Sequence, residues 1–473
     1  MEAEPKNQIP ASPQRRTVLL LINSALGPRM SGPGIRYWEF ARTLSRLPAL
    51  DVALVTTPGS PAQPVAGAPP FHLHAGRDEA HLLALAQDAD VLVTPGAVVS
   101  LYPFLLRTDV PLALDLTIPR LLEELQRPSP HALDQQALHL DRVRATLLTQ
   151  IRAADFILCA SEKQRDYWLG ALAAAGRINP HTHAHDPTLR RLIDVVPFGL
   201  PSDPPRRTRS VLKGVVPGID PDDRVLLWGG GLYDWLDAPT LVRAMARLAP
   251  RWLNVKLFFM GTRHPNPQES QRRGTRRTLA LADELGLTGR TVFFNDWVPY
   301  AERANYLLEA DLGVSLHRDH LETRFSFRTR FLDILWTGLP VVATGGDVFG
   351  DLVEREELGR TVAPGDVDGV AEAIVALLET PDLRQSYRAR FEGVARAYRW
   401  ERVVEPLAAF CTAPEFAPDR GHLERGGGLS AGPTPWWRLP GKAWQALRAG
   451  GARGLARQVG AYRRWLRQRR GKR

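Results

Sequence analysis

The chain has 473 residues, of which 44% are hydrophobic and 24% charged, a composition that excludes a fibrous or wholly disordered protein. At about 150 residues per domain, this length predicts two or three domains. The net charge of +10 is concentrated at one end, because residues 413–473 hold 14 Lys or Arg and only 3 Asp or Glu. The basic character therefore belongs to a tail.

The cysteine content and the N-terminal region both indicate a cytoplasmic protein. Cys159 and Cys411 are the only cysteines, too few for a disulfide framework and typical of a reducing compartment. The apolar run at 18–22 follows Arg15 and Arg16 but is too short for a membrane span or a signal-peptide core.

Residues 16–200 are predicted to form a first Rossmann-like half. It begins with a strand at 18–22, followed by a loop rich in Gly and Pro at 27–34 and a helix that begins near Ile35. The further strands expected are 52–56, 91–94, 112–116, 156–160 and 193–196, and the helices expected between them are 78–86 and 134–152. Strands that alternate with helices indicate a parallel, doubly wound sheet.

A segment rich in Pro and Arg at 201–221 predicts a linker, and residues 222–411 a second Rossmann-like half. The expected strands are 224–228, 255–260, 291–295, 312–316, 340–344 and 360–363. The expected helices are 239–248, 277–285, 301–309, 326–336, 367–378, 383–398 and 401–410. The chain is thus predicted to be an α/β protein that binds its ligand at the carboxyl ends of the strands, facing a cleft between the halves.

Glycine-containing segments follow the first strand of each half. Gly32 and Gly34 lie in one of them, and Gly230 and Gly231 lie in the other. Glycine lets the backbone approach a ligand closely, and a following helix N-terminus offers N–H groups to an anion or a sugar hydroxyl. The second segment lacks the Lys and Ser/Thr of a P-loop, which argues against an ATPase. A plain turn is the alternative for both segments.

The segment 322–333 carries three arginines close together. Ser326 is predicted to cap a helix, so that Arg328 and Thr329 lie in its first turn. Cations are unfavourable at this end of a helix, whereas a diphosphate there could be held by guanidinium groups and backbone N–H groups. We therefore predict a diphosphate site, with Asp333 accepting hydrogen bonds from ribose hydroxyls. A solvated basic helix start is the alternative.

The stretch from Arg328 to Val342 resembles the nucleotide-sugar motif of the retaining glycosyltransferases of family 4 (glycosyl transferases group 1), which have the two-domain GT-B fold. Gly338 and the Leu-Pro-Val-Val that follows fix the register and place the second acid of the family motif at Asp333. The similarity extends over the Gly-Pro-Gly loop and residues 154–161, 196–199 and 229–244, and so covers residues 17–411 in outline.

Departures from the family pattern indicate a divergent subgroup. The first acid of the motif, which contacts the donor sugar, falls on Phe325, and Glu322 is the candidate substitute. The basic residues that hold the diphosphate fall on Gly231 and Leu236, and the arginines at 324, 328 and 330 could supply that charge instead. The resemblance implies a donor site made of Gly230, Gly231, Glu322, Arg324, Ser326, Phe327, Arg328, Thr329 and Asp333. On the acceptor side of the cleft it implies Gly32, Gly34, Arg36 and Asp115.

The activity implied is transfer of a hexose, with retention, from a nucleoside diphosphate sugar to a glycan or lipid-linked acceptor in envelope polysaccharide synthesis. No Asp-x-Asp lies directly at the end of a predicted strand, and arginines at a helix N-terminus can stabilise the leaving diphosphate, so we expect neither a metal nor a cofactor. A non-hydrolysing sugar-nucleotide epimerase and an inactive transferase-like scaffold are the alternatives.

Two further patterns lie outside this motif. His181, His183 and His185 alternate in a Pro-flanked segment, which predicts a surface loop without a metal. Residues 436–473 contain 12 basic residues and no acid, with apolar residues on one face of a predicted helix. We expect this tail to lie on the anionic inner face of the cell membrane and not to bind nucleic acid. A merely solvated tail is the other alternative.

Overall fold

The computed structural model describes residues 15–28, 30–65, 68–127, 129, 131–263 and 273–425. One compact unit extends to Asp419, and a second unit begins at Arg420. Of the second unit only α18 (Arg420–Arg425) is described. The predicted tail helix within 436–473 lies outside the described residues. None of the helices in the described ranges is long and apolar enough to cross a membrane.

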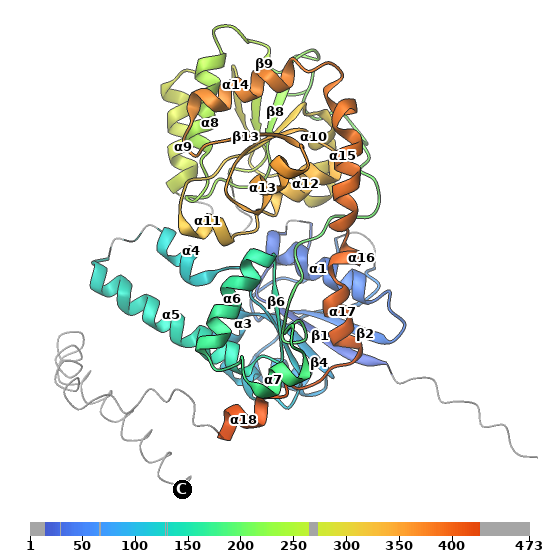
Figure 1. The fold of residues 1–473 in the computed structure, drawn as a ribbon. Helices are drawn as coiled ribbons and strands as arrows, with labels where there is room; N and C mark the ends of the chain where they lie inside the picture. The colour runs from blue at the N-terminus through green and yellow to red at the C-terminus, as the bar shows by residue number, and fades with distance from the viewer. Residues whose placement is uncertain are drawn as a thin grey trace, which may run out of the picture. The chain divides into compact units, whose positions relative to one another are not determined.

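The first half is built on a seven-stranded parallel sheet in the order β3-β2-β1-β4-β5-β6-β7 (Figure 1). Its strands are β1 (Arg16–Ile22), β2 (Leu50–Thr56), β3 (His72–Ala75), β4 (Val91–Pro95), β5 (Leu112–Asp115), β6 (Phe156–Cys159) and β7 (Ile193–Val195). Side chains of β1 point alternately into two apolar clusters, so the strand is buried on both faces. This burial accounts for its continuous apolar sequence.

Helices cover both faces of this sheet. They are α1 (Gly32–Leu44), α2 (Glu79–Gln87), α3 (Gly96–Leu101), α4 (Arg120–Gln126), α5 (Leu133–Ala153), α6 (Glu162–Ala174) and α7 (Pro180–His185), with a 3-10 turn, η1 (Pro103–Arg107). The prediction of a loop at 181–185 is wrong, because α7 forms there. Asn179 caps it by accepting hydrogen bonds from the N–H groups of His181 and Thr182, and Pro180 occupies its first position.

The second half contains a six-stranded parallel sheet in the order β10-β9-β8-β11-β12-β13. Its strands are β8 (Arg224–Trp228), β9 (Val255–Phe259), β10 (Val292–Phe294), β11 (Leu312–Ser315), β12 (Val341–Thr344) and β13 (Gly359–Val362). Around it lie α8 (Ala238–Leu248), α9 (Arg273–Glu284), η3 (Tyr300–Glu302), α10 (Arg303–Glu309), α11 (Leu321–Phe325), α12 (Arg330–Thr337), α13 (Val348–Arg355), α14 (Val367–Leu378) and α15 (Leu383–Ala397). Two parallel, doubly wound sheets confirm the predicted fold class.

The last two helices of the compact unit return to the first half. These are α16 (Trp400–Val403) and α17 (Glu405–Thr412), and Trp400, Leu407 and Cys411 belong to the same apolar cluster as β1 and β2. This packing assigns residues 400–411 to the first half, whereas the sequence placed them in the second. The chain therefore crosses between the halves twice.

The two crossings lie side by side. The N–H of Leu200 donates to the carbonyl of Tyr398 at 2.8 Å, and the N–H of Trp400 donates to the carbonyl of Leu200 at 3.1 Å. A Cβ on Gly199 would lie 2.6 Å from a ring carbon of Trp400. Only glycine allows this approach.

Strand order reverses between β1 and β4 in the first sheet and between β8 and β11 in the second. In open parallel sheets, ligands bind at the carboxyl ends of the strands where this reversal occurs. In the second half, a ligand site is therefore expected at the segments that follow β8 and β11.

Candidate functional site

Arg330 lies over the glycine loop that follows β8. Gly230 has a φ of 76°, in the left-handed region that glycine adopts without strain. The side chain of Arg330, the first residue of α12, donates from Nη2 to the carbonyl of Gly231 at 2.9 Å. Its guanidinium carbon lies 5.4 Å from the ring centre of Trp228 and 5.9 Å from that of Tyr233. The start of α12 and the glycine loop thus form one surface.

The charge of Arg330 is not neutralised within the described part of the chain. No carboxylate among the described residues forms an ion pair with it, and its Nη1 is buried without a hydrogen-bond partner. Burial lowers the pKa of this guanidinium to about 10. A half-buried cation with one buried, unused donor beside a glycine loop is suited to an anionic ligand.

Other buried nitrogens without a hydrogen-bond partner lie at the same edge of the second sheet. Nine buried side-chain nitrogen or oxygen atoms of the described residues have no hydrogen-bond partner. Five of them are nitrogens of Trp228, His317, His320, Arg328 and Arg330. Leaving a buried polar group unpaired costs about 1–3 kcal/mol. A ligand rich in acceptor oxygens would satisfy several of these groups at once.

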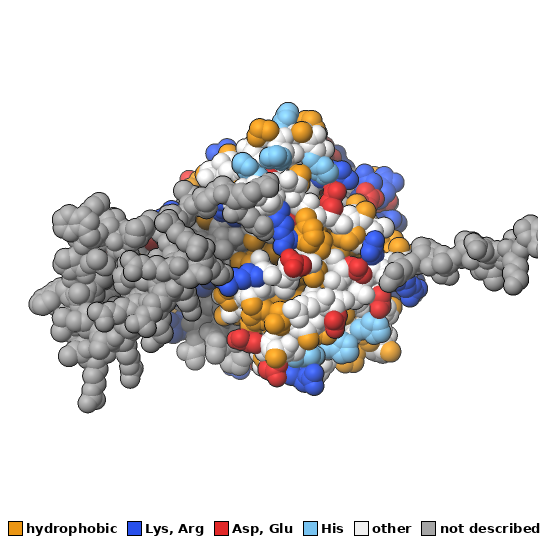
Figure 2. All heavy atoms as spheres, turned by 90° about the horizontal axis from the view of Figure 1, so that it is seen from below, with side chains coloured by type: hydrophobic (Ala, Val, Ile, Leu, Met, Phe, Trp, Pro, Cys, Tyr) orange, Lys and Arg blue, Asp and Glu red, His pale blue; other side chains and the backbone are white. Residues whose placement is uncertain are grey.

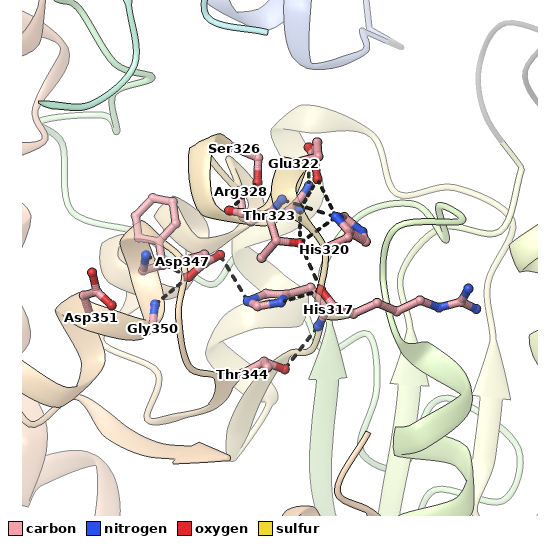
Figure 3. A network of polar contacts seen from close by, with 12 residues as sticks. His317, His320, Glu322, Thr323, Ser326, Arg328, Thr344, Asp347, Gly350 and Asp351 are labelled. Carbon is pink, nitrogen blue, oxygen red and sulfur yellow. Dashed lines mark hydrogen bonds and ion pairs between the residues drawn. The ribbon is translucent and has the colours of Figure 1, made fainter. Parts of the chain in front are cut away.

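Arg328 forms a buried ion pair with Glu322 (Figure 3). Its Nη2 donates to Glu322 Oε2 at 2.7 Å and its Nη1 to Oε1 at 3.3 Å, and the two side chains are only 7% and 5% exposed. Both carboxylate oxygens of Glu322 are therefore engaged by an arginine of the same segment. This geometry does not favour Glu322 as a substitute for an acid that contacts a donor sugar.

Two histidines stand beside this pair (Figure 3). His320 caps α11 by accepting at Nδ1 from the N–H of Thr323 at 3.3 Å, and burial lowers its pKa. The backbone N–H of His317 donates to Thr344 Oγ1 at 3.1 Å, and its Nε2 lies 3.5 Å from Asp347 Oδ2. The ends of β11 and β12 are thereby joined to the start of α13.

The prediction that Ser326 caps a helix over 326–336 is wrong. α11 ends at Phe325 and α12 begins only at Arg330, and Ser326 follows the end of α11, where its hydroxyl donates to the carbonyl of Thr323. Thr329 precedes α12 without a side-chain capping bond. Phe327 lies between the two helices and packs against Phe349 with ring centres 4.7 Å apart. This partly buried ring fills the space between the two helices.

The three arginines of the segment are not gathered at one place. Arg324 is exposed in the last turn of α11, Arg328 is paired with Glu322, and Arg330 alone contacts the glycine loop. The anion-binding feature that the sequence predicted for the group therefore rests on Arg330.

Residues 223–380 match the family model described as glycosyl transferases group 1. The match covers about a third of the chain. The matched region contains β8 through β13 and every position of the predicted donor site.

Curated relatives match parts of the chain. The phosphatidyl-myo-inositol mannosyltransferase of Mycobacterium leprae is 34% identical over 82 residues, which are 17% of this chain and 22% of that protein. The protein of the same name from Mycolicibacterium smegmatis is 27% identical over 163 residues, 34% of this chain and 38% of that protein. The chain thus covers well under half of the length of either relative.

Solved structures match nearly the whole of the compact unit. Sucrose-phosphate synthase from Thermosynechococcus elongatus superposes with a TM-score of 0.59 at 18% identity, over 84% of this chain and 98% of that one. Anabaena HepE in complex with UDP and glucose gives a TM-score of 0.57 at 14% identity, over 84% and 100% of the two chains. The chain has the GT-B fold of these glycosyltransferases.

In the second half, Asp333, which occupies the position of the second acid of the family motif, is accessible. Asp333 lies on α12, one turn from Arg330, and its side chain is 36% exposed. One of its oxygens, Oδ1, accepts from Nε of Arg303 at 2.9 Å. The position of the first family acid, Phe325, is occupied by a ring whose centre lies 5.1 Å from that of Tyr167 in the first half.

The residues predicted on the acceptor side form an internal network. Nε of Arg36 donates to Asp115 Oδ2 at 2.7 Å, and each side chain is 3% exposed. The other guanidinium nitrogens donate to the carbonyls of Val196 and Pro197 at 2.7 and 2.8 Å. Arg36 and Asp115 thus join the end of β5 to the first crossing of the chain, and their polar atoms are used within the protein.

Of the two predicted glycines at this edge, only Gly34 is a site of close packing. A Cβ on Gly34 would lie 2.9 Å from the carbonyl oxygen of Ala25, and one on Gly32 would lie 3.9 Å from the ring of Phe198. α1 begins at Gly32, three residues earlier than predicted. Gly34 therefore lets the first turn of α1 sit against the loop that follows β1.

Sequence reasoning did not identify Trp228, Arg303 and His320 as part of this site. No local pattern marks them, because each reaches the site through the packing of a different strand, helix or loop. The pairing of Arg303 with Asp333 joins positions 30 residues apart.

Proposed function

We propose that this chain is a glycosyltransferase that moves a hexose, with retention, from a nucleoside diphosphate sugar to a glycan or lipid-linked acceptor in envelope polysaccharide synthesis. The match of residues 223–380 to glycosyl transferases group 1 supports the reaction class. The UDP and glucose in the Anabaena structure support a nucleotide-sugar donor. The names of the two curated relatives, which act on phosphatidyl-myo-inositol, support an acceptor carried by a lipid.

The observation that carries the proposal is the unneutralised guanidinium of Arg330 beside Gly230 and Gly231. Departure of the sugar leaves negative charge on the diphosphate, and fixed donors aimed at that charge lower the barrier. Arg330 and the N-terminus of α12 supply positive potential at one point. We therefore place the diphosphate there, place the ribose at Asp333, and propose that the reaction requires no metal ion.

Nucleotide binding tests the donor site directly. Isothermal calorimetry of the full chain with UDP, GDP, ADP and dTDP should show binding of at least one of them. Arg330→Gln should weaken that binding by at least about tenfold, because a hydrogen bond to a charged group contributes about 1.5–3 kcal/mol. Arg243→Gln is the matched control, since Arg243 is exposed on α8, and it should leave the affinity unchanged.

The outcomes separate the alternatives. Equal binding by Arg330→Gln and the wild type would remove the diphosphate from this surface. Lack of binding to all four nucleotides would favour a transferase-like scaffold. Turnover of a sugar nucleotide to its epimer without any acceptor would favour an epimerase.

We further propose that the basic tail holds the enzyme on the cytoplasmic face of an anionic membrane. The face of the described residues shown in Figure 2 mixes basic, acidic, histidine and apolar side chains and offers no continuous basic surface. The tail, in contrast, has 12 basic residues and no acid over 436–473. Each basic residue near such a surface contributes about 1 kcal/mol, so the tail is the part of the chain suited to this contact.

Charge reversal in the tail tests this role. The full chain should co-sediment with vesicles of phosphatidylglycerol and phosphatidylcholine but not with phosphatidylcholine alone. Replacing Arg463, Arg464 and Arg467 by Glu should lower partitioning by about a hundredfold or more. The same change in net charge on the compact unit, made by replacing Arg388, Arg390 and Arg402 by Glu, should lower partitioning much less. Equal partitioning of the two triple variants would contradict a specific role for the tail.

A further inference from the structure

Asp333 is held on one side by an arginine from a distant part of the sequence. Nε of Arg303, the first residue of α10, donates to Asp333 Oδ1 at 2.9 Å. Within the described residues, no hydrogen bond is made to Asp333 Oδ2. Since the side chain of Asp333 is 36% exposed and that of Arg303 only 11%, the pair presents its carboxylate outward and keeps its guanidinium inside.

The guanidinium of Arg303 is itself fixed from three directions. Its Nη1 donates to the carbonyl of Tyr300 at 2.7 Å, and its carbon lies 3.7 Å from the ring centre of Tyr300 and 4.6 Å from that of Trp336. Trp336 in turn donates from Nε1 to the carbonyl of Asp203 at 2.9 Å. A planar cation held between two rings and a carbonyl has little freedom to rotate, so its partner Asp333 is held in one orientation.

The pairing with Arg303 also determines which oxygen of Asp333 is left for a ligand. A carboxylate oxygen accepts hydrogen bonds and donates none. With Oδ1 engaged by Arg303, Oδ2 is available for a hydroxyl of a ligand. An aspartate on an exposed helix turn without this partner would sample several rotamers, and ordering them would reduce the affinity.

We propose that Arg303 is a positioning residue that fixes Asp333 so that Oδ2 recognises a ribose hydroxyl of the donor nucleotide. The proposal rests on the donor site described under the proposed function. It goes beyond that site by assigning the discrimination between ribose and deoxyribose to an arginine outside the family motif. Arg303 acts through Asp333 and does not itself contact the ligand.

The test compares ribose and deoxyribose ligands on the full chain. Calorimetry measures the dissociation constants of UDP, 2′-deoxy-UDP and 3′-deoxy-UDP, with the corresponding ligands of another base if that base binds more tightly. The wild type should bind the ribose form at least about tenfold more tightly than one of the deoxy forms. In Arg303→Met this ratio should fall to within about twofold, and Arg303→Lys should restore part of it.

The ratio separates positioning from a purely structural role. A variant that merely loosens the fold weakens the binding of all three ligands alike and leaves the ratio of their dissociation constants unchanged. Arg384→Met is the matched control, because Arg384 donates to the carbonyls of Leu307 and Ala310 at the other end of α10 and should not alter the ratio. Asp333→Asn should abolish the discrimination between ribose and deoxyribose, and the double variant Asp333→Asn/Arg303→Met should show no further loss.

The outcomes distinguish this inference from the proposed function. If no nucleoside diphosphate binds the wild type, the donor site itself is refuted. If UDP binds with discrimination that persists in Arg303→Met, the positioning role is refuted and the donor site stands. If Arg303→Met does not fold, Arg303→Lys provides the test: its discrimination should fall below that of the wild type, and discrimination equal to the wild type would refute the positioning role.

Discussion

Gly199 allows the two segments that connect the halves to lie close to each other. Gly199 has no positive φ, so its requirement is steric and comes from Trp400, whose ring and Cα would lie within 2.6–3.0 Å of an added Cβ. Trp400 is 1% exposed and belongs to the apolar core of the first half. The ring cannot move aside without disturbing that core.

Gly199→Ala should therefore destabilise the protein. Overpacking of a well-packed site costs about 1–3 kcal/mol, which thermal or denaturant unfolding of the full chain would measure. Gly170→Ala is the control, since Gly170 lies in α6 with no atom within 4 Å of an added Cβ. This change should raise stability by about 0.5–1 kcal/mol. A Gly199→Ala variant as stable as the wild type would show that the crossings separate easily.

Elements with a clear physical signal were predictable from the sequence. Strands buried on both faces read as short apolar runs, which is why β1 and β8 were placed correctly. β3 was missed because it is a short edge strand whose residues are mostly exposed. α7 was missed although Asn179 and Pro180 form a helix start, because alternating histidines with flanking prolines suggested a loop.

The candidate site was predictable only in part. The glycine loop and Asp333 follow from their places after β8 and within the family motif. The break between α11 and α12 could not be foreseen from Ser326, because the packing of Phe327 against Phe349 between the two helices is a tertiary contact. Three contacts of the site depend on how separate segments pack. They are the ion pair of Glu322 with Arg328, the hydrogen bond of Arg330 to Gly231 and the ion pair of Arg303 with Asp333. Local propensity carries no information on such contacts.

At the scale of the whole compact unit, its C-terminal end is fastened to the first half. Arg177 donates from Nε and Nη2 to the two oxygens of Asp419 at 2.9 and 3.1 Å, and the side chains are 1% and 0% exposed. Asn179 donates to the same carboxylate at 2.8 Å, and the N–H of Ala417 donates to Asp155 at 2.8 Å. The point where the unit ends is therefore fixed.

Asp419→Ala should destabilise the full chain strongly. Removing one partner of a buried ion pair leaves an uncompensated charge and costs about 3–5 kcal/mol, whereas replacing both partners by apolar residues restores much of the loss. Chemical unfolding of Asp419→Ala and of the double variant Arg177→Met/Asp419→Leu would measure both values. Asp351→Ala breaks the half-exposed pair with Lys163 and should cost less than about 1 kcal/mol. A similarly small effect of Asp419→Ala would contradict this account.

The paired crossings have a consequence for how such a protein can be assembled. Because Leu200 and Trp400 are hydrogen-bonded neighbours, the whole second half leaves and rejoins the first half at nearly the same point. Along the sequence, the second half is an insertion between two segments of the first half, which is itself a single α/β domain. Inserts whose ends meet are well tolerated by the domain that receives them. Exchange of the segment between these two points, in evolution or by design, would replace the second half while leaving the core around β1 and α17 intact.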